Sequence, residues 1–520
     1  MRKFYYYLHL LILIIIGISA VFYFNFTAED AYITYRYAEN WVNLGSLVYN
    51  EGEPINAMTS PLHAILSAAF FSVTGNTVLS NKIFSFVLLL ISTLLVWYRY
   101  REHLHFQVLG LILLIPPSVL LWTFGGLETP ILLFLATLSV ILVLRPHTFN
   151  LNWLCVVLLL AGLAFLTRYD SILFFLPVAL YTTSKAQSIK DVVVALAVAA
   201  ILPLAWLFFS FYYYGDLLPT SFYVKTPKGG LTDLFFNGVY IASYLLYIGI
   251  IPAVGLVFTL LVPKNKMVHT LSRHIKSMWW LYMGLLLEIS YGLTMATHHM
   301  MFSFRFFVPY IPVTVILVID LLHHASESRE VDLSTGRPAY LFAGFLVCLM
   351  LFQLYQNVYT YNRSVNGISA IGEYRAVGIR DYVSFMQILK AEALDIENHW
   401  EAMNGDGGRS PRIITYAAGM LPYTYRESYI YEKLVSYRHC HQRYHQELHA
   451  DYIHTVAPRL GQIEELLSRP GSTYYLVSSY EMFFDGSTQK FLVYYNPEPE
   501  AHNLTSGINE PCELNNKNEN

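Results

Sequence analysis

Long apolar runs recur through the first 360 residues of the chain and alternate with short polar loops. An α-helix needs about 20 apolar residues to cross a bilayer. The pattern predicts eleven membrane spans, at about 7–24, 83–98, 106–123, 128–144, 152–166, 171–183, 189–211, 238–262, 278–295, 305–323 and 338–357. The first run follows Met1-Arg2-Lys3 and has no small-residue cleavage site, so it predicts an anchor with a cytoplasmic N-terminus.

The distribution of Lys and Arg predicts which loops face the cytoplasm, because cations in short loops favour that side. If the short run 62–74 does not cross, the cytoplasmic loops hold 13 of these cations and the outer loops hold 6. If it crosses, every later loop changes side and the bias reverses. We therefore expect 62–74 to be a re-entrant or membrane-lying helix on the outer face. The equally short run 171–183 is expected to cross, and the C-terminus is expected outside.

The composition changes at about residue 362, where charged residues, His and Gly become frequent. Two strand-like runs, 412–416 and 473–478, alternate there with polar, helix-like stretches. The sequence predicts a polytopic α-helical membrane domain over residues 1–361, with its first outer loop at 25–61. A small extracytoplasmic α/β domain is predicted over residues 362–520.

Composition excludes several classes of protein. Hydrophobic residues make up 55% of the chain and charged residues only 13%, with a mean hydropathy of +0.42. An ordinary soluble chain is about 25% charged, so a soluble enzyme is excluded. The formal net charge of −3 gives no basic bias, which argues against a nucleic-acid partner. Four cysteines are too few for a disulfide framework.

The most polar motifs of the membrane domain fall on the outer side in this topology. Ionisable groups at the ends of spans are candidates for function. Six clusters share this placement, at residues 29–30, 59–61, 126–129, 168–170, 215–226 and 298–305. The cytoplasmic loops contain no P-loop or glycine-rich nucleotide motif, so no residues support a cytosolic nucleotide-sugar site. The pattern predicts a cavity that opens to the outside.

The first outer loop carries an acidic pair next to an amphipathic helix. Ile33, Tyr37 and Trp41 are spaced by four, and the segment is rich in the aromatic residues that suit the headgroup level. Glu29 and Asp30 stand where this helix begins, and a carboxylate there can take a proton from a sugar hydroxyl. The alternative is structural, because residues 27–30 have the form of a capping box in which Asp30 stabilises the helix start.

Several motifs resemble those of a known family. They are Glu29-Asp30-Ala31-Tyr32-Ile33-Thr34-Tyr35-Arg36-Tyr37-Ala38, Thr59-Ser60-Pro61-Leu62, Gly126-Leu127-Glu128-Thr129, Leu166-Thr167-Arg168, Gly215-Asp216-Leu217-Leu218-Pro219, Phe222-Tyr223-Val224-Lys225-Thr226 and Arg305-Phe306. In this order they resemble the terminal β-(1→2)-arabinofuranosyltransferases (AftB-like) over the chain to about residue 425. That resemblance implies a GT-C fold and transfer of a sugar from a polyprenyl-phosphate donor on the outer face of the bacterial inner membrane. Glu29 replaces the family's usual aspartate and Tyr169 its usual proline, which leaves the sugar's identity open.

The resemblance also implies roles for individual residues. A lipid phosphate leaves without a general acid, so one base and a few cations suffice. Asp30 is implied as the base, with Glu29 as a second carboxylate. Arg168, Lys225 and Arg305 are implied to hold the donor phosphate, the alternative for each being an interface anchor that reaches the headgroups. The residues expected to bind the sugar or acceptor are Tyr35, Arg36, Ser60, Glu128 and Asp216.

The sequence leaves the cofactor and the acceptor open. Glu29 and Asp30 offer oxygen ligands for Mg²⁺ or Mn²⁺. The histidine-rich run 439–454 has the spacing of a zinc site, and its alternative is a solvated polar helix. The solvated helix is the commoner outcome for such a run. The acceptor can be an envelope glycan, a lipopolysaccharide or a secreted protein such as a pilin. A flippase for lipid-linked sugars is the alternative from another class; it needs polar residues inside the spans, where Glu288 is the main one.

Overall fold

The computed structural model of the chain describes residues 2–114, 116–145, 149–224, 231–247, 264–295, 302–329, 336–362, 379–405, 409–432, 435, 450–456, 474–484 and 487–497. The chain divides into two compact units. Met1–Thr27, Asn81–Pro203 and Pro227–Arg380 form the first unit, and Ala28–Ser80, Leu204–Thr226 and Asp381–Asn520 form the second. The first outer loop thus groups with the C-terminal residues, and the predicted domain boundary at residue 361 remains a prediction.

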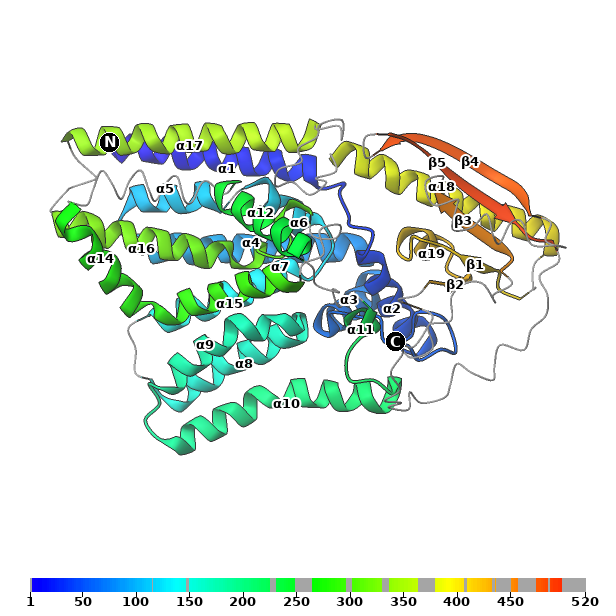
Figure 1. Cartoon of the computed structure of the whole chain (residues 1–520), viewed down its shortest axis with the longest axis horizontal. Helices are drawn as coiled ribbons and strands as arrows, with labels where there is room; N and C mark the ends of the chain where they lie inside the picture. The colour runs from blue at the N-terminus through cyan, green and yellow to red at the C-terminus, as the bar shows by residue number, and fades with distance from the viewer. Residues whose placement is uncertain are drawn as a thin grey trace. The chain divides into compact units, whose positions relative to one another are not determined.

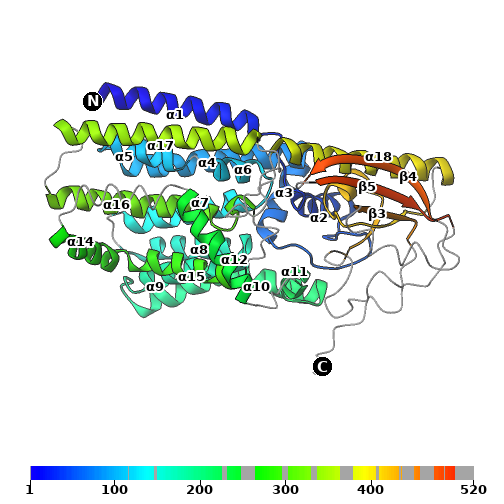
Figure 2. The same ribbon diagram turned by 45° about the horizontal axis from the view of Figure 1, so that its top comes forward.

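The first unit is a bundle of helices. Figures 1 and 2 show α1 beside α17 and α8 beside α9, and these pairs are in contact. Its elements are α1 (Arg2–Tyr23), α4 (Thr77–Arg99), α5 (Leu104–Leu113), α6 (Pro117–Phe124), α7 (Thr129–Leu144), α8 (Leu151–Thr167), η1 (Tyr169–Ser171), α9 (Ile172–Thr183), α10 (Ile189–Tyr214), α12 (Leu231–Tyr247), α14 (Lys264–Ser277), α15 (Trp279–Met295), η2 (Phe302–Phe304), η3 (Val308–Tyr310), α16 (Ile311–Arg329) and α17 (Gly336–Asn362). Helices α4 and α10 each continue into the second unit.

Five described helices are long and apolar enough to cross a membrane: Arg2–Tyr23, Thr77–Arg99, Ile189–Tyr214, Val308–Ser326 and Gly336–Tyr359. The predicted span 106–123 corresponds to α5 and α6, which together form one candidate span bent by 60°. The other predicted spans fall on shorter helices, and the end of 238–262 lies outside the described residues. The chain is therefore a multi-pass membrane protein, while the count of eleven spans stays a prediction.

Burial separates the helices at the centre of the bundle from those at its edge. The apolar window of the 308–326 span is 83% buried inside the protein, whereas that of α10 is only 11% buried. A helix that is apolar all round and buried by its neighbours belongs to the core of a bundle. Helix α8 packs closely on α10 at Gly162, where a Cβ atom would lie 2.4 Å from the carbonyl oxygen of Ala199.

The second unit combines short helices with a five-stranded sheet. Its helices are α2 (Ala31–Leu44), α3 (Pro61–Thr74), α11 (Thr220–Val224), α18 (Ile379–Asn404) and α19 (Met420–Thr424). The sheet has the order β2-β1-β3-β5-β4, with strands β1 (Arg412–Ile414), β2 (Tyr429–Tyr431), β3 (Tyr452–Val456), β4 (Tyr475–Phe484) and β5 (Ser487–Tyr495). β1 is parallel to β2 and β3, and β5 is antiparallel to β3 and β4. The predicted C-terminal α/β region is confirmed.

Helix α18 packs along the sheet (Figure 1). Its buried residues Leu389, Ala393 and Ile396 recur at helical spacing and form the apolar side of the contact. Two polar contacts fix its register, since Tyr480 Oη donates to Asp395 at 2.7 Å and Glu392 Oε2 lies 2.9 Å from His454 Nε2. The predicted short helix 62–74 is α3, with 14 residues, and its relation to the membrane stays a prediction.

Candidate active site

The acidic pair lies in the second unit, at the start of α2. Asp30 occupies the N-cap position, directly before the first helical residue, Ala31, and its side chain makes no capping hydrogen bond. The helix thus begins three residues later than a capping box over residues 27–30 would start it. Both residues are half-buried.

Residues from the C-terminal part of the chain hold Glu29 in place. The backbone N–H of Glu29 donates a hydrogen bond of 2.7 Å to Tyr382 Oη, and its carboxylate accepts one from the backbone N–H of Gly419. The approach of the two backbones is so close that a Cβ on Gly419 would lie 2.0 Å from the Glu29 carbonyl oxygen. Only glycine fits at this position.

The electrostatic environment of Glu29 favours its protonated form. Burial raises the pKa of Glu29 to about 8, and the neighbouring negative charge of Asp30 acts in the same direction. The backbone hydrogen bonds from Gly419 and Met420 favour the ionised form and oppose this shift. At neutral pH Glu29 therefore mostly keeps its proton, chiefly because burial disfavours the charged form.

Helix α2 buries two of the residues expected to bind the sugar or acceptor, Tyr35 and Arg36. Tyr35 is 0% exposed, and its ring packs against Tyr32, His63 and Tyr423 at centroid distances of 5.8, 6.0 and 6.3 Å. The Arg36 guanidinium donates to three backbone carbonyls, those of Tyr49, Pro422 and Ser428. These contacts give both residues structural roles in joining α2 to the C-terminal residues. The contact expected between these two residues and a sugar stays a prediction.

Ser60 and Asp216 also lie in the second unit. Ser60 precedes α3 and is buried, and its hydroxyl has no hydrogen-bond partner among the described residues. Asp216 is half-buried, and its backbone carbonyl accepts a 2.8 Å hydrogen bond from Ser210 Oγ. Asn56 links the two segments, since its Nδ2 donates to Ser210 Oγ at 3.0 Å and its carbonyl accepts from the Thr220 N–H at 2.7 Å. The carboxylate of Asp216 thus stands on a segment tied to the first outer loop.

The first unit brings together three predicted residues from distant parts of the chain. Glu128 Oε1 lies 3.3 Å from Arg168 Nη1 and 3.3 Å from Arg305 Nη2. Glu128 comes directly before α7, Arg168 directly after α8, and Arg305 just before η3. Because α7 and α8 follow one another and pack together, the start of one helix and the end of the next meet. All three side chains are largely buried, with 4%, 14% and 10% exposure.

Asp170 completes this cluster of charges. It accepts two hydrogen bonds from Arg168, from Nη2 at 2.8 Å and from Nε at 3.1 Å. Such bidentate pairs are the strong ones, whereas the 3.3 Å contacts to Glu128 are long for charge-assisted bonds, about 2.7–2.9 Å. Arg168 is therefore held firmly by Asp170, and the contacts of both arginines with Glu128 are the weaker ones. Asp170 follows Arg168 by two residues, a spacing that did not by itself indicate an ion pair.

Two consecutive residues with left-handed backbone conformation precede Arg305. Ser303 has φ of 48° and Phe304 has φ of 58°, which non-glycine residues rarely adopt. The Ser303 carbonyl accepts a 3.1 Å hydrogen bond from Trp122 Nε1, and Arg305 stacks over the Trp122 ring at 5.3 Å. Strain of this kind persists where the surroundings determine a functional geometry. Trp122 thus fixes both the turn and the guanidinium it presents.

Some predicted groups lie outside the described residues, namely Lys225, the loop 298–301 and the histidines between 439 and 449. Within the described part of the chain, no cluster of three or more metal-ligating side chains occurs. His454, the last residue of the histidine run, lies in β3 and pairs with Glu392. Tyr382 and Gly419 had no signal in the local sequence, since they contact Glu29 across more than 350 residues.

The fold of the chain is similar to that of solved structures of ArnT. The structure of ArnT from Cupriavidus metallidurans in the apo state is similar over 93% of this chain and 97% of that chain, with a TM-score of 0.56 and 11% identity. The structure of ArnT bound to undecaprenyl phosphate is similar over 92% and 97%, with a TM-score of 0.52 and 11% identity. The chain therefore has the GT-C fold that was predicted.

Sequence comparison adds a family match over part of the chain. Residues 58–209 match the family described as dolichyl-phosphate-mannose-protein mannosyltransferase. No curated protein matches the chain. The matched segment includes Ser60, Glu128 and Arg168, and it ends before Asp216 and Arg305.

Proposed function

We propose that this protein is a glycosyltransferase that moves a sugar from a polyprenyl-phosphate donor to an acceptor hydroxyl. The observation that carries the proposal is the buried cluster in which Arg168 and Arg305 share one oxygen of Glu128. The GT-C fold supports it, because ArnT with that fold was solved with undecaprenyl phosphate bound. The family match to dolichyl-phosphate-mannose-protein mannosyltransferase supports a lipid-phosphate sugar as donor.

The two arginines bind the phosphate of the donor. A phosphate oxygen takes the place of Glu128 Oε1 between the guanidinium groups, while Asp170 continues to orient Arg168. Arginine suits this role because its planar fork bonds phosphate in a bidentate manner. Displaced from the arginines, the Glu128 carboxylate becomes available to accept a hydrogen bond from a sugar hydroxyl. Lys225 is proposed as a further cation for the phosphate.

Asp30 is the proposed general base. It takes the proton of the acceptor hydroxyl as the hydroxyl oxygen attacks the anomeric carbon of the sugar. The bond between that carbon and the phosphate oxygen breaks, and the phosphate leaves with the electron pair. Glu29 stays protonated at neutral pH, since its pKa is raised to about 8, and it donates a hydrogen bond to the acceptor. Mg²⁺ or Mn²⁺ held by the oxygens of Glu29 and Asp30 stays the alternative use of this acidic pair.

For the sugar and the acceptor we keep two candidates. The first is an arabinofuranose transferred to an envelope glycan or lipopolysaccharide on the periplasmic face, as the motifs of the first outer loop imply. The second is a sugar transferred to a hydroxyl of a secreted protein, which the family match over residues 58–209 favours. Asp216 and Ser60, on linked segments of the second unit, are proposed to contact the sugar or acceptor in either case.

Binding of the lipid phosphate tests the proposal directly. Undecaprenyl phosphate is titrated into the purified full-length protein in nanodiscs, and its binding is followed by native mass spectrometry. We expect Arg305→Gln to weaken binding by about tenfold or more, because a charge-assisted contact contributes about 1.5–3 kcal/mol. Arg273→Gln, at an exposed arginine on α14, is the matched control and is expected to bind as the wild type does.

Equal binding by the wild type and the Arg305→Gln variant would contradict the phosphate assignment. Binding that is retained without any covalent transfer, together with movement of the intact lipid-linked sugar across the bilayer, would support the flippase alternative instead. With a lipid-linked sugar as donor, the mass of the acceptor distinguishes the transferase from the flippase, since only transfer of the sugar changes this mass.

A further inference from the structure

A second polar site lies in the first unit, at the other end of the helices that present Glu128 and Arg305. Glu128 directly precedes α7 and Arg145 directly follows it, so the two are separated by the 16 residues of this helix. At 1.5 Å per residue this is about 24 Å along the helix axis. The site is therefore distinct from the cluster proposed to hold the donor phosphate.

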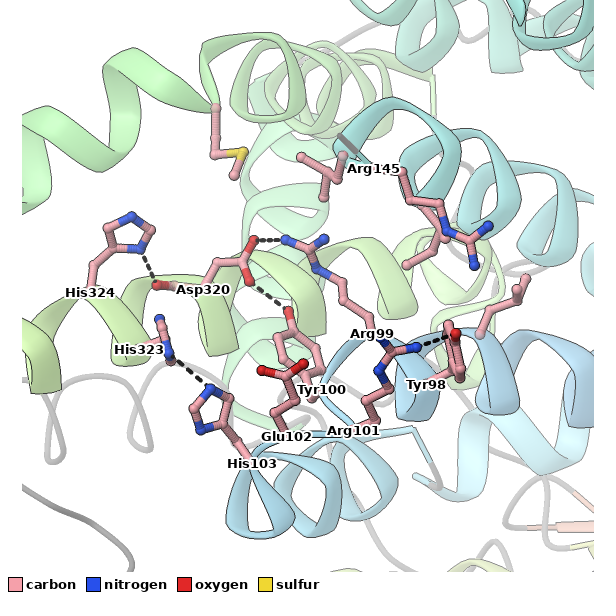
Figure 3. Close-up of a pocket in the computed structure, with 14 residues that line it drawn as sticks. Tyr98, Arg99, Tyr100, Arg101, Glu102, His103, Arg145, Asp320, His323 and His324 are labelled. Carbon is pink, nitrogen blue, oxygen red and sulfur yellow. Dashed lines mark hydrogen bonds and ion pairs between the residues drawn. The ribbon is translucent and has the colours of Figure 1, made fainter. Parts of the chain in front are cut away.

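This end of the bundle contains a cavity of about 610 Å³. Its polar lining includes Tyr98, Arg99, Arg101, Arg145, Asp320 and His323, and Leu95, Ile141, Leu144 and Met278 add an apolar wall. Figure 3 shows Arg101 and Arg145 on the Tyr98 side of the cavity, with Asp320 on the other side. A site that is basic at one part and apolar at another matches an amphipathic ligand.

The carboxylate of Asp320 is already engaged. It accepts hydrogen bonds of 2.8 Å from Arg99 Nη2 and 2.8 Å from Tyr100 Oη. Arg99 Nε is buried and makes no hydrogen bond within the described residues. The one other acidic residue of the lining, Glu102, is exposed and carries a single charge. The lining thus holds three arginines against two carboxylates, an excess of positive charge.

Arg101 and Arg145 share a tyrosine and have no carboxylate partner in the part of the chain that the structure describes. Arg101 lies over the Tyr98 ring at 4.6 Å and donates to its hydroxyl, and Arg145 lies over the same ring at 5.8 Å. Both arginines are exposed, so each can offer its guanidinium to a ligand. Two such groups converging on one ring form a ready clamp for a phosphate, which accepts bidentate bonds from arginine.

The position of the clamp favours a lipid as the source of the phosphate. Tyr98 and Arg99 end α4, a helix long enough to cross the bilayer, so they stand at the level of the headgroups. Trp97 and Tyr98 are 37% and 47% exposed, as is usual for aromatic residues at the membrane interface. Basic pockets between membrane helices are suited to anionic headgroups.

We propose that this cavity binds the phosphate headgroup of an anionic phospholipid, with Arg101 and Arg145 as its clamp. The acyl chains leave along the apolar wall formed by Leu95, Ile141 and Leu144. The lipid fills the end of the bundle away from Glu128 and stabilises the packing of α4, α7 and α16 there. The predicted sidedness puts this site in the cytoplasmic leaflet.

Thermal stability in nanodiscs of defined lipid tests the proposal. The full-length protein is compared in phosphatidylcholine alone and with rising fractions of phosphatidylglycerol. We expect phosphatidylglycerol to raise Tm in a saturable manner. Arg101→Gln/Arg145→Gln is expected to need a roughly 30-fold higher fraction of phosphatidylglycerol, since each arginine near an anionic surface contributes about 1 kcal/mol. Arg273→Gln is the control and should respond as the wild type does.

Inorganic phosphate added to phosphatidylcholine nanodiscs separates the two sources of phosphate. No rise in Tm with inorganic phosphate supports the lipid, whereas a rise that the double variant loses would assign the site to a soluble phosphate and overturn the lipid. Native mass spectrometry counts bound phosphatidylglycerol as a second readout. An equal count and an equal shift of Tm in the wild type and double variant would also overturn the proposal.

Discussion

The carboxylate of Glu29 accepts a hydrogen bond from the backbone N–H of Gly419, a residue 390 positions further along the chain. The contact joins the loop before α2 to the residue before α19 and fixes the acidic pair at the start of α2. The proposed chemistry depends on this placement, because a general base must lie within reach of the acceptor hydroxyl.

Substitution of Gly419 tests the close approach. A Cβ at this position would overlap the Glu29 carbonyl oxygen at 2.0 Å, so Gly419→Ala must displace one of the two backbones. We expect a loss of about 1–3 kcal/mol in stability, as for other overpacked sites, and a strong loss of transfer activity. The readouts are Tm in nanodiscs and the rate of sugar transfer.

The control for this variant is Gly344→Ala in α17. A Cβ at Gly344 meets no atom within 4 Å, and alanine is the better helix former. This variant is expected to keep the wild-type rate and Tm, or to raise Tm slightly. If Gly419→Ala behaved in the same manner, Glu29 would not depend on this contact.

The base assignment predicts the effect of removing one charge from the pair. Asp30→Asn keeps the size of the side chain and one acceptor oxygen, but the amide cannot take up the proton. We expect transfer to fall by about 10²–10⁴-fold, the usual contribution of a general base, with unchanged expression and Tm. Glu51→Gln, at an exposed position of the same loop, is the matched control and should keep full activity. Activity within a few-fold of wild type in Asp30→Asn would remove the assignment.

The raised pKa of Glu29 predicts that the stability of the protein depends on pH. Because the pKa of Glu29 in the folded protein is raised to about 8, the folded state holds a proton that the unfolded chain releases at lower pH. Stability therefore falls as pH rises from the ordinary carboxyl range through about 8. Glu29→Gln removes this component, so its Tm should decline less than that of the wild type over this interval. Parallel curves for the two proteins would show that Glu29 does not titrate in this range.

Removal of the Glu128 charge is expected to lower stability and to strengthen donor binding. Glu128→Gln removes the negative charge that Arg168 and Arg305 share, which leaves two buried arginines with less compensation. Breaking a buried ion pair costs about 3–5 kcal/mol, so Tm should fall. Affinity for undecaprenyl phosphate should rise, because the anion no longer competes with the carboxylate. Weaker binding in this variant would mean that Glu128 supports the arginines rather than competing for them.

The sequence predicted the cluster of Glu128, Arg168 and Arg305 better than it predicted the contacts around Glu29 and Asp30. The alternation of spans placed Glu128, Arg168 and Arg305 at one end of the bundle, and the structure brings them to one oxygen atom. Helix direction is enough for such a prediction, because consecutive antiparallel helices bring the start of one to the end of the other. Asp170 belonged to the same polar motif, although its pairing with Arg168 became clear only from the geometry.

The surroundings of Glu29 and Arg36 could not be derived in the same way. Arg36 belongs to the motif of the first outer loop, but its partners Pro422 and Ser428 lie in the C-terminal part of the chain. These contacts involve backbone carbonyls, which leave no mark in the residue pattern. Strands β2, β3 and β5 were also missed. β3 is buried at all five of its positions, so it lacks the alternation of apolar and polar residues that identifies a half-buried strand.

Transfer from a lipid-linked sugar is the most direct test of the central claim. The purified protein in proteoliposomes is given labelled polyprenyl-phosphate arabinofuranose or polyprenyl-phosphate mannose, or the matching nucleotide sugars, together with envelope glycan or secreted protein. The account predicts that label passes from one of the lipid donors to an acceptor, that Asp30→Asn abolishes this step, and that the nucleotide sugars are inert. Transfer from a nucleotide sugar in the absence of lipid phosphate would contradict it.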